Sequence, residues 1–341
     1  MNAVMALAAL LLGTGLASAQ QQAPRDWAAE WPGTDFEQSS VVFSEIRSGG
    51  PPKDGIPAID APKFERLENG MARGWASALS PIEAVVALEL GGDARAYPLR
   101  VLIWHEIVND TVAGMPVAVT YCPLCNAALA FRRTLDGRVF DFGTTGKLRH
   151  SDLIMYDRQT ESWWQQFTGE AIVGELTGAE LELVPSRLAS FGQFAKDFPN
   201  GRVLVPTDPQ SREYGRNPYV RYDAAGQTPF LYGGDLPEGI DPMERVVAIE
   251  TSAGMFEAWP LSRVRAEGEI RRDQLILRWQ AGQASALDAP TVDAGRDIGT
   301  VSVSRVTDGG AEAVAFDTPF AFAFHAFRPD SPIHVEKQPD G

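Results

Sequence analysis

The middle of the chain alternates short apolar runs with turns rich in glycine and proline. Two such runs flank Gly91-Gly92-Asp93 and stop at Pro98, a pattern that predicts a β-hairpin. Other runs have the β-branched and aromatic composition of strands, and they occupy residues 115–121, 129–133, 139–142, 153–156, 163–167, 181–184 and 320–324. Helical spacing of apolar residues is found at 99–109 and 188–198. We therefore expect a mainly β protein of the α+β class, with short helices.

The C-terminal part of the chain resembles the first hairpin and the segments that follow it. The corresponding segments are 85–89 and 246–250, 96–101 and 258–264, 117–121 and 275–279, and 139–142 and 300–304. This similarity suggests an internal duplication of a β-rich unit, the alternative being a chance resemblance of two amphipathic hairpins. The second unit has no counterpart of His105, Cys122 or Cys125. If the two units share a fold, these residues are not needed for it, which points to a function for them.

Length and turn composition predict two β-rich lobes rather than one small core. Along the 341 residues we expect a signal peptide at 1–19, an N-terminal arm at 20–70, a first β-rich lobe with the C-x-x-C site at 71–185, a helix and connecting segment at 186–241, and a second β-rich lobe at 242–336. The net charge of −15 and the absence of any lysine or arginine cluster argue against nucleic acid as a partner.

The N-terminus has the pattern of a signal for export. An apolar run from Val4 to Leu12 is followed by Ala17-Ser18-Ala19, which fits the small-residue rule for cleavage after residue 19. Only the amino terminus supplies positive charge, because no lysine or arginine lies near the start. No later segment has the length of apolar sequence that a membrane span needs. We expect a periplasmic or secreted protein without a stable membrane span.

The only two cysteines of the chain follow an apolar strand-like run with the spacing C-x-x-C. Two thiolates cannot build a four-cysteine zinc site, so mixed ligation is required. We expect a soft metal ion, copper first and zinc as the commoner default, bound by Cys122, Cys125 and His105 and completed by His150 or a water. Further candidates for ligation or support are Met155 and Asp152.

Two other classes of function remain open on the sequence. A thiol-dependent or hydrolytic enzyme would use Cys122 with His105 and Asp152. A non-catalytic scaffold would close the cysteines as a disulfide, which is common in exported proteins, and bind a small molecule in an aromatic pocket. Residues 143–147 lack the spacing of a phosphate-binding loop and are expected to form a tight turn, so we expect no nucleotide cofactor.

Two long blocks of this sequence resemble a known family. They are WHEIVNDTVAGMPVAVTYCPLC at 104–125 and FDFGTTGKLRHSDLIMYDRQTESWWQQFTGEAIVGELTG at 140–178. The blocks resemble the bacterial and archaeal family known as domain of unknown function 3179, and the likeness extends from about Gly70 to Val335. The resemblance implies a secreted or envelope protein of unassigned activity. Members commonly carry another residue at the position of His150, so the resemblance does not support this histidine as a ligand.

Overall fold

The computed structural model describes residues 22–252 and 255–335, and the expected signal peptide at 1–19 lies outside these residues. Within them the protein is mainly β with short helices, as expected. The helices are α1 (Arg25–Glu30), α2 (Leu99–His105), α3 (Phe191–Asp197), α4 (Leu261–Glu267), α5 (Ala321–Phe327) and the 3₁₀ turns η1 (Phe43–Glu45) and η2 (Gly74–Ala78). No helix among the described residues has both the length and the apolar character that crossing a membrane requires.

The first part of the chain forms three larger sheets and a small hairpin. The first sheet has the order β1 (Ile46–Ser48), β10 (Phe142–Arg149), β11 (Asp152–Asp157), β12 (Trp163–Gln165), β13 (Ala171–Val173). The second sheet has the order β14 (Leu183–Val184), β7 (Ala127–Arg132), β6 (Met115–Cys122), β5 (Ile107–Val112). The third has the order β15 (Ser186–Ser190), β3 (Ala84–Leu90), β4 (Asp93–Pro98), β16 (Arg202–Val205), β2 (Lys63–Arg66), and the hairpin pairs β8 (Thr134–Leu135) with β9 (Arg138–Val139).

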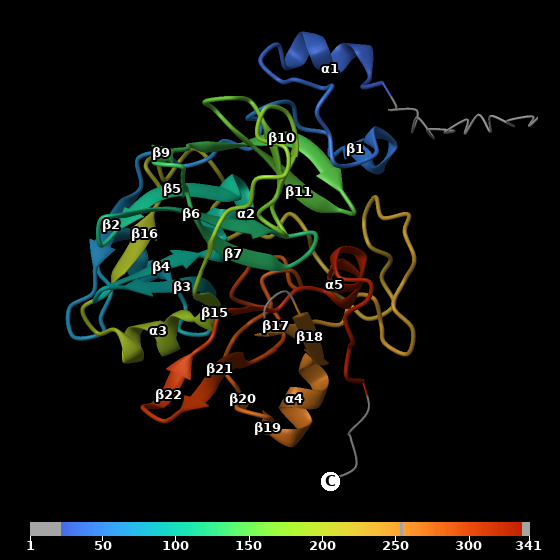
Figure 1. Ribbon diagram of the computed structural model, residues 1–341. Helices are drawn as coiled ribbons and strands as arrows, with labels where there is room; N and C mark the ends of the chain where they lie inside the picture. The colour runs from blue at the N-terminus through green and yellow to red at the C-terminus, as the bar shows by residue number, and fades with distance from the viewer. Residues whose placement is uncertain (1–21, 253–254, 336–341) are drawn as a thin grey trace, which may run out of the picture.

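The C-terminal part forms two further sheets at the opposite end of the molecule from α1 and β1 (Figure 1). One has the order β18 (Met255–Pro260), β17 (Val246–Ser252), β23 (Phe316–Asp317). The other has the order β19 (Glu269–Arg272), β20 (Leu275–Gln280), β21 (Thr300–Thr307), β22 (Gly310–Ala313). The neighbouring strands of both sheets run antiparallel.

The order of elements is shared by the two parts of the chain. In each part a hairpin ends at a proline, and this proline is the N-terminal cap of a seven-residue helix: Pro98 for α2 and Pro260 for α4. Antiparallel strands follow the helix in both parts. Proline suits this place because its fixed φ leads into a helix and its missing N–H would have no intrahelical partner. The common order agrees with the sequence comparison, and an internal duplication stays a prediction.

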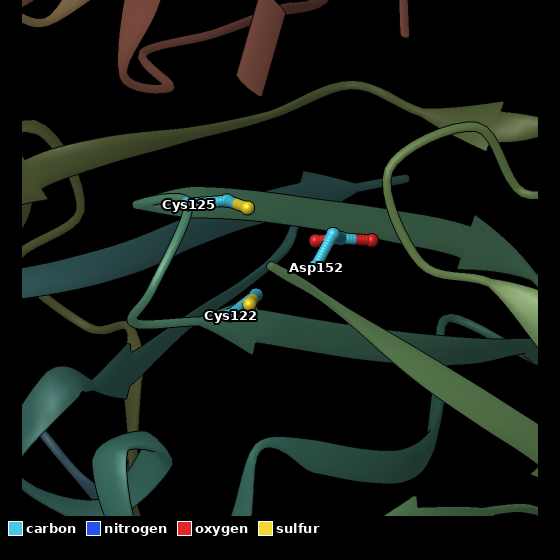
Figure 2. A group of neighbouring side chains, drawn as sticks. All are labelled: Cys122, Cys125 and Asp152. Carbon is cyan, nitrogen blue, oxygen red and sulfur yellow. The ribbon is translucent and has the colours of Figure 1, made fainter. Parts of the chain in front are cut away.

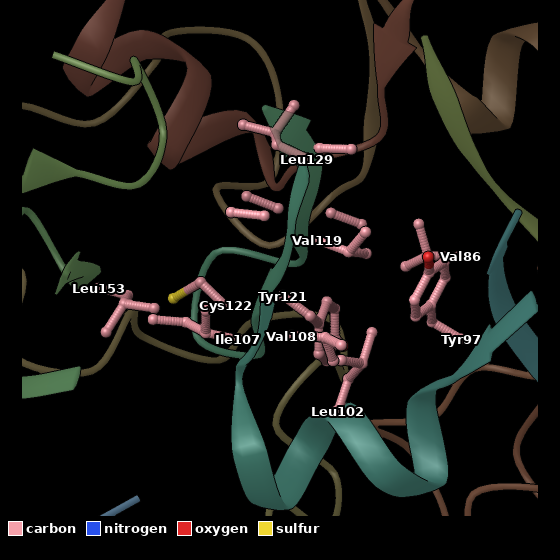
Figure 3. Packing of buried hydrophobic residues seen from close by; sticks show 14 of the residues in the cluster. Val86, Tyr97, Leu102, Ile107, Val108, Val119, Tyr121, Cys122, Leu129 and Leu153 are labelled. Atoms are coloured by element: carbon pink, nitrogen blue, oxygen red, sulfur yellow. The ribbon is translucent and has the colours of Figure 1, made fainter. Parts of the chain in front are cut away.

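The largest hydrophobic cluster draws on both predicted lobes. Its residues run from Ile59 to Ala323, and it includes Phe320 and Phe322 of the C-terminal part together with residues of β5, β6 and β7. Figure 3 shows the part of this cluster around β6, where the side chain of Cys122 lies among apolar neighbours. Burial of these side chains removes apolar surface from water and holds the ends of β5, β6 and β7 in place. The lobe boundaries themselves stay a prediction.

The N-terminal arm packs against the first sheet. Trp27 and Trp31 are buried and contact Trp163 of β12, with ring centroids 5.1 and 5.3 Å apart. The ammonium of Lys147 on β10 lies over these rings and pairs with Glu30 at 2.8 Å. The aromatic contacts and the ion pair therefore tie the segment before β1 to β10 and β12 of the first sheet.

Three predicted elements were wrong. The strand expected at 139–142 does not form, because Val139 ends β9, Phe142 begins β10, and the two residues between them belong to neither strand. Residues 320–324 begin the helix α5 instead of forming a strand, and their alternating sequence misled because both the phenylalanines and the alanines are buried. Periodicity identifies a strand only where one face is exposed. Residues 143–147 lie within β10, at an irregularity of its pairing with β11, and not in a tight turn. There Gly146 has φ +70° and approaches the backbone of Pro51, which a side chain would obstruct.

Candidate metal centre

The two cysteines lie at the end of β6 and in the turn that follows it. Cys122 is the last residue of β6 and pairs with Ala127 at the start of β7. The turn between them contains Cys125 and ends at Asn126, whose φ of +52° is a conformation that asparagine tolerates better than most residues. The amide of Asn126 donates to Thr318 O at 2.8 Å, which fixes the turn against the C-terminal part. This local geometry holds both thiols on the same side of the sheet.

Asp152 reaches the cysteines from a different sheet. It is the first residue of β11 and follows a hairpin turn in which His150 and Ser151 have φ of +52° and +68°. The two sulfur atoms and a carboxylate oxygen of Asp152 all lie within 4.8 Å of one another, and all three side chains are buried (Figure 2). Both cysteines are free thiols. The group therefore combines two soft donors and one hard donor in a space that a single metal ion could share.

The hydrogen bonds of Asp152 leave one of its oxygens available. Oδ2 accepts from Gln165 Nε2 at 2.7 Å and from the backbone N of Phe167 at 2.9 Å. Oδ1 is buried and has no hydrogen-bond partner. A buried polar atom without a partner is costly, and in native proteins it marks a functional group or a ligand position. One oxygen is thus oriented by the protein, while the other is free to bind an ion.

Burial dominates the protonation of this group. It raises the pKa of Asp152 to about 7, against the opposing effect of the donors from Gln165 and Phe167. Burial also raises the pKa of the thiols of Cys122 and Cys125, and the negative charge of Asp152 raises both further. Without a cation the two thiols are therefore held in their neutral forms near pH 7, whereas Asp152 is about half protonated there. A metal ion would displace their protons and supply the positive charge that the site lacks.

Glu106 is a second buried acid that the sequence analysis did not select. It follows α2 directly with φ +58°, and its backbone O accepts from Tyr121 N at 2.8 Å, beside the end of β6. Burial raises the pKa of Glu106 to about 8, and the charge of Asp152 adds to this rise. The signal in the sequence was a carboxylate directly before the apolar pair Ile107-Val108, inside the helical segment expected at 99–109.

The structure corrects the histidine part of the predicted site. Within the described residues, the group that could hold a metal contains no histidine. His105 contacts Pro57 O through Nδ1 and Tyr214 OH through Nε2, both at 2.7 Å, so both ring nitrogens are engaged elsewhere. His150 lies in the turn before Asp152, with Nε2 3.6 Å from Glu45. The sequence placed these rings near the sulfurs only by proximity along the chain.

Met155 does not belong to the group either. It lies three residues beyond Asp152 on β11, and the alternation of side chains along a strand places it on the other face. Trp163 and Trp164 of β12 are completely buried in the core, so these two rings line no open aromatic pocket.

The segment between β16 and β17 covers the group. The hydroxyl of Tyr222 donates to Leu124 O at 3.0 Å, within the C-x-x-C turn. The hydroxyl of Ser151, next to Asp152, donates to Phe230 O. Two hydrogen bonds thus hold this segment over the cysteine turn and over the β10–β11 turn, and burial under it excludes water from the thiols.

Fold and site together define a mainly β protein that buries a dithiol and a carboxyl at the junction of two sheets. A family model described as "Protein of unknown function (DUF3179)" matches residues 53–331, and the chain belongs to this family. The resemblance of the two sequence blocks is thereby confirmed. Searches of curated proteins and of solved structures found no match.

Proposed function

We propose that this protein is exported and binds one soft metal ion through Cys122, Cys125 and Asp152, with copper preferred to zinc. The observation that carries the proposal is the approach of the three donor atoms to within 4.8 Å of one another in a buried group. Two thiolates select soft or borderline ions. Copper(I) accepts two or three ligands, whereas a tetrahedral zinc site would need a fourth donor besides this group.

Export and a role in envelope metal handling or redox chemistry belong to the same proposal. The support is the small-residue pattern Ala17-Ser18-Ala19 after an apolar run. N-terminal sequencing of the protein from a periplasmic or culture fraction would test it, and we expect the mature chain to begin at Gln20. Full-length protein in the cytoplasmic fraction alone would contradict export.

A thiol-dependent enzyme receives less support from the same geometry. A nucleophilic cysteine needs a lowered pKa and a base within reach. Burial raises the pKa of the Cys122 thiol, and His105 is engaged by Pro57 and Tyr214. The other alternative is a scaffold with a structural disulfide. It predicts oxidised cysteines in the native protein, whereas the metal proposal requires reduced ones.

The test is an anaerobic titration of the reduced mature protein with copper(I), in competition with a chromophoric chelator. We expect one copper per chain and a thiolate-to-copper absorption band in the ultraviolet. Cys122→Ser and Cys125→Ser should abolish the band, and Asp152→Asn should weaken binding. His105→Gln and His150→Gln are the matched controls. They remove the two imidazoles that the sequence suggested as ligands, and both variants should bind copper like the unmodified chain.

Two results would contradict the metal proposal. The first is a stoichiometric Cys122–Cys125 disulfide in protein isolated under native conditions, without bound metal. The second is unchanged copper binding after replacement of both cysteines, which would locate the ion elsewhere. A parallel titration with zinc decides the order of the two metals.

A further inference from the structure

A second cavity lies apart from the cysteine group, between the two parts of the chain. It has a volume of about 230 Å³ and opens between β7, β14 and β15 on one side and β17, β18, β23 and α5 on the other. Much of its wall is apolar and aromatic, formed by Leu129, Phe167, Phe256, Phe316 and Phe324. Cavities between packed units with apolar walls and few polar groups are the usual form of small-molecule sites.

Arg328 supplies a positive charge to this cavity. It follows α5 as its C-terminal cap, and its guanidinium lies over the ring of Phe256, 4.2 Å from the centroid. The hydrogen bond found for its side chain within the described residues runs from Nη1 to Phe327 O and is long, at 3.5 Å. No carboxylate of the described residues forms an ion pair with it. A guanidinium has five N–H donors in a planar fork, so most of its capacity is available to a ligand.

The acidic groups around the cavity act on Arg328 at longer range. Burial lowers the pKa of the Arg328 guanidinium below its usual value, and the charges of Glu250, Glu180 and Glu170 oppose this in part. Asp317 also lines the cavity, where its Oδ1 accepts from Ala128 N at 3.1 Å and its buried Oδ2 has no partner. The arginine stays charged because a guanidinium is intrinsically a very strong base, and none of these acids forms an ion pair with it.

We propose that this cavity binds a small monocarboxylate that carries an apolar ring or chain. The carboxylate pairs with Arg328 in a two-pronged contact, and the apolar part lies among Phe167, Phe316 and Phe324. Guanidinium and carboxylate match in geometry and form some of the strongest hydrogen bonds in proteins. The modest volume favours a ligand smaller than most drug-sized molecules. The proposal does not depend on metal binding at the cysteine group.

Calorimetric titration of the full metal-free chain tests this, with 3-phenylpropanoate as the probe. 3-Phenylpropan-1-ol and 3-phenylpropylamine carry the same apolar group without the negative charge and serve as comparison ligands. We expect the acid to bind at least tenfold more tightly than the alcohol, because a charge-assisted hydrogen bond is lost with the carboxylate. The amine should bind no more tightly than the alcohol.

Two substitutions place the ligand in the cavity. Arg328→Gln should lower the affinity for the acid to that for the alcohol, while Arg278→Gln, at an exposed arginine of β20, should leave it unchanged. Ala315→Phe should abolish binding of acid and alcohol by filling the cavity. Circular dichroism confirms that each variant is folded.

Several outcomes would overturn the proposal. They are equal binding of acid and alcohol, tighter binding of the amine, no binding of the acid at millimolar concentration, or an unchanged affinity after Arg328→Gln. If a variant fails to fold, the comparison of the three ligands on the unmodified chain still decides, because it requires no substitution.

Discussion

Asp317 offers a quantitative test of how burial controls protonation in this protein. Its side chain lies between β23 and β7, is 9% exposed, and accepts one hydrogen bond from Ala128 N through Oδ1. Burial raises the pKa of Asp317 from 3.8 to about 7. The change to make is Asp317→Asn, because the amide oxygen can keep the bond from Ala128 while the ionisable group is removed.

The sign of the effect follows from proton binding. Between pH 3.8 and about 7 the folded chain keeps the proton of Asp317 and the unfolded chain loses it. The stability of the unmodified chain therefore falls by up to about 1.4 kcal/mol per pH unit through this window and levels off above it. From pH 5 to pH 8 the Asn variant should gain about 3 kcal/mol relative to the unmodified chain, as an upper estimate. Any cost of the buried amide group is constant across this range.

The assay is urea unfolding at a series of pH values, with a chelator and a reductant present to keep the cysteine group free of metal. The quantity of interest is the difference in unfolding free energy between the Asn variant and the unmodified chain, so that other titrating groups cancel. Asp308→Asn, at an exposed aspartate before β22, controls for the loss of a surface charge. A difference that stays flat from pH 5 to pH 8, or falls, would refute the reasoning.

Three further predictions concern packing elsewhere in the first part of the chain. Arg100→Ala removes the partner of the completely buried carboxylate of Glu83, and we expect urea unfolding to show a loss of about 3–5 kcal/mol. Trp31→Ala should cost about 3–5 kcal/mol and release the N-terminal arm to early cleavage in limited proteolysis. Gly146→Ala should lower the melting temperature, because φ is +70° and the new methyl group would collide with Pro51 O, at a cost above about 1 kcal/mol. For each variant, an unfolding midpoint in urea or heat equal to that of the unmodified chain would contradict the contact named for it.

Much of the β structure could be predicted because its strands are short and regularly punctuated. The hairpin of β3 and β4 was marked by two apolar runs, a glycine turn and Pro98. The same signals marked β17, β18 and Pro260 in the second half. These features are local, since strand composition, turn chemistry and the fixed φ of proline act within a few residues. Where all faces of an element are buried, as at the start of α5, the spacing of apolar residues no longer distinguishes a helix from a strand.

The residues of the candidate site also differ in how far the sequence could select them. Cys122 and Cys125 could be selected because four consecutive residues and one turn bring them together. Asp152 could be considered only as a neighbour of other candidates, and its partnership with the sulfurs arises because β11 of one sheet meets the end of β6 in another. The choice between Asp152 and His105 depended on side-chain directions that local sequence does not encode.

The sequence by itself determined the strand pattern, the family and the pair of thiols, because each is written in adjacent or regularly spaced residues. The tertiary structure decided which acid joins the thiols, that His105 turns to Tyr214, and that Glu106 lies buried near them. It also decided where a charged arginine faces an aromatic cavity. These outcomes depend on the packing of sheets that are distant along the chain, and packing fixes both the direction and the solvation of each side chain.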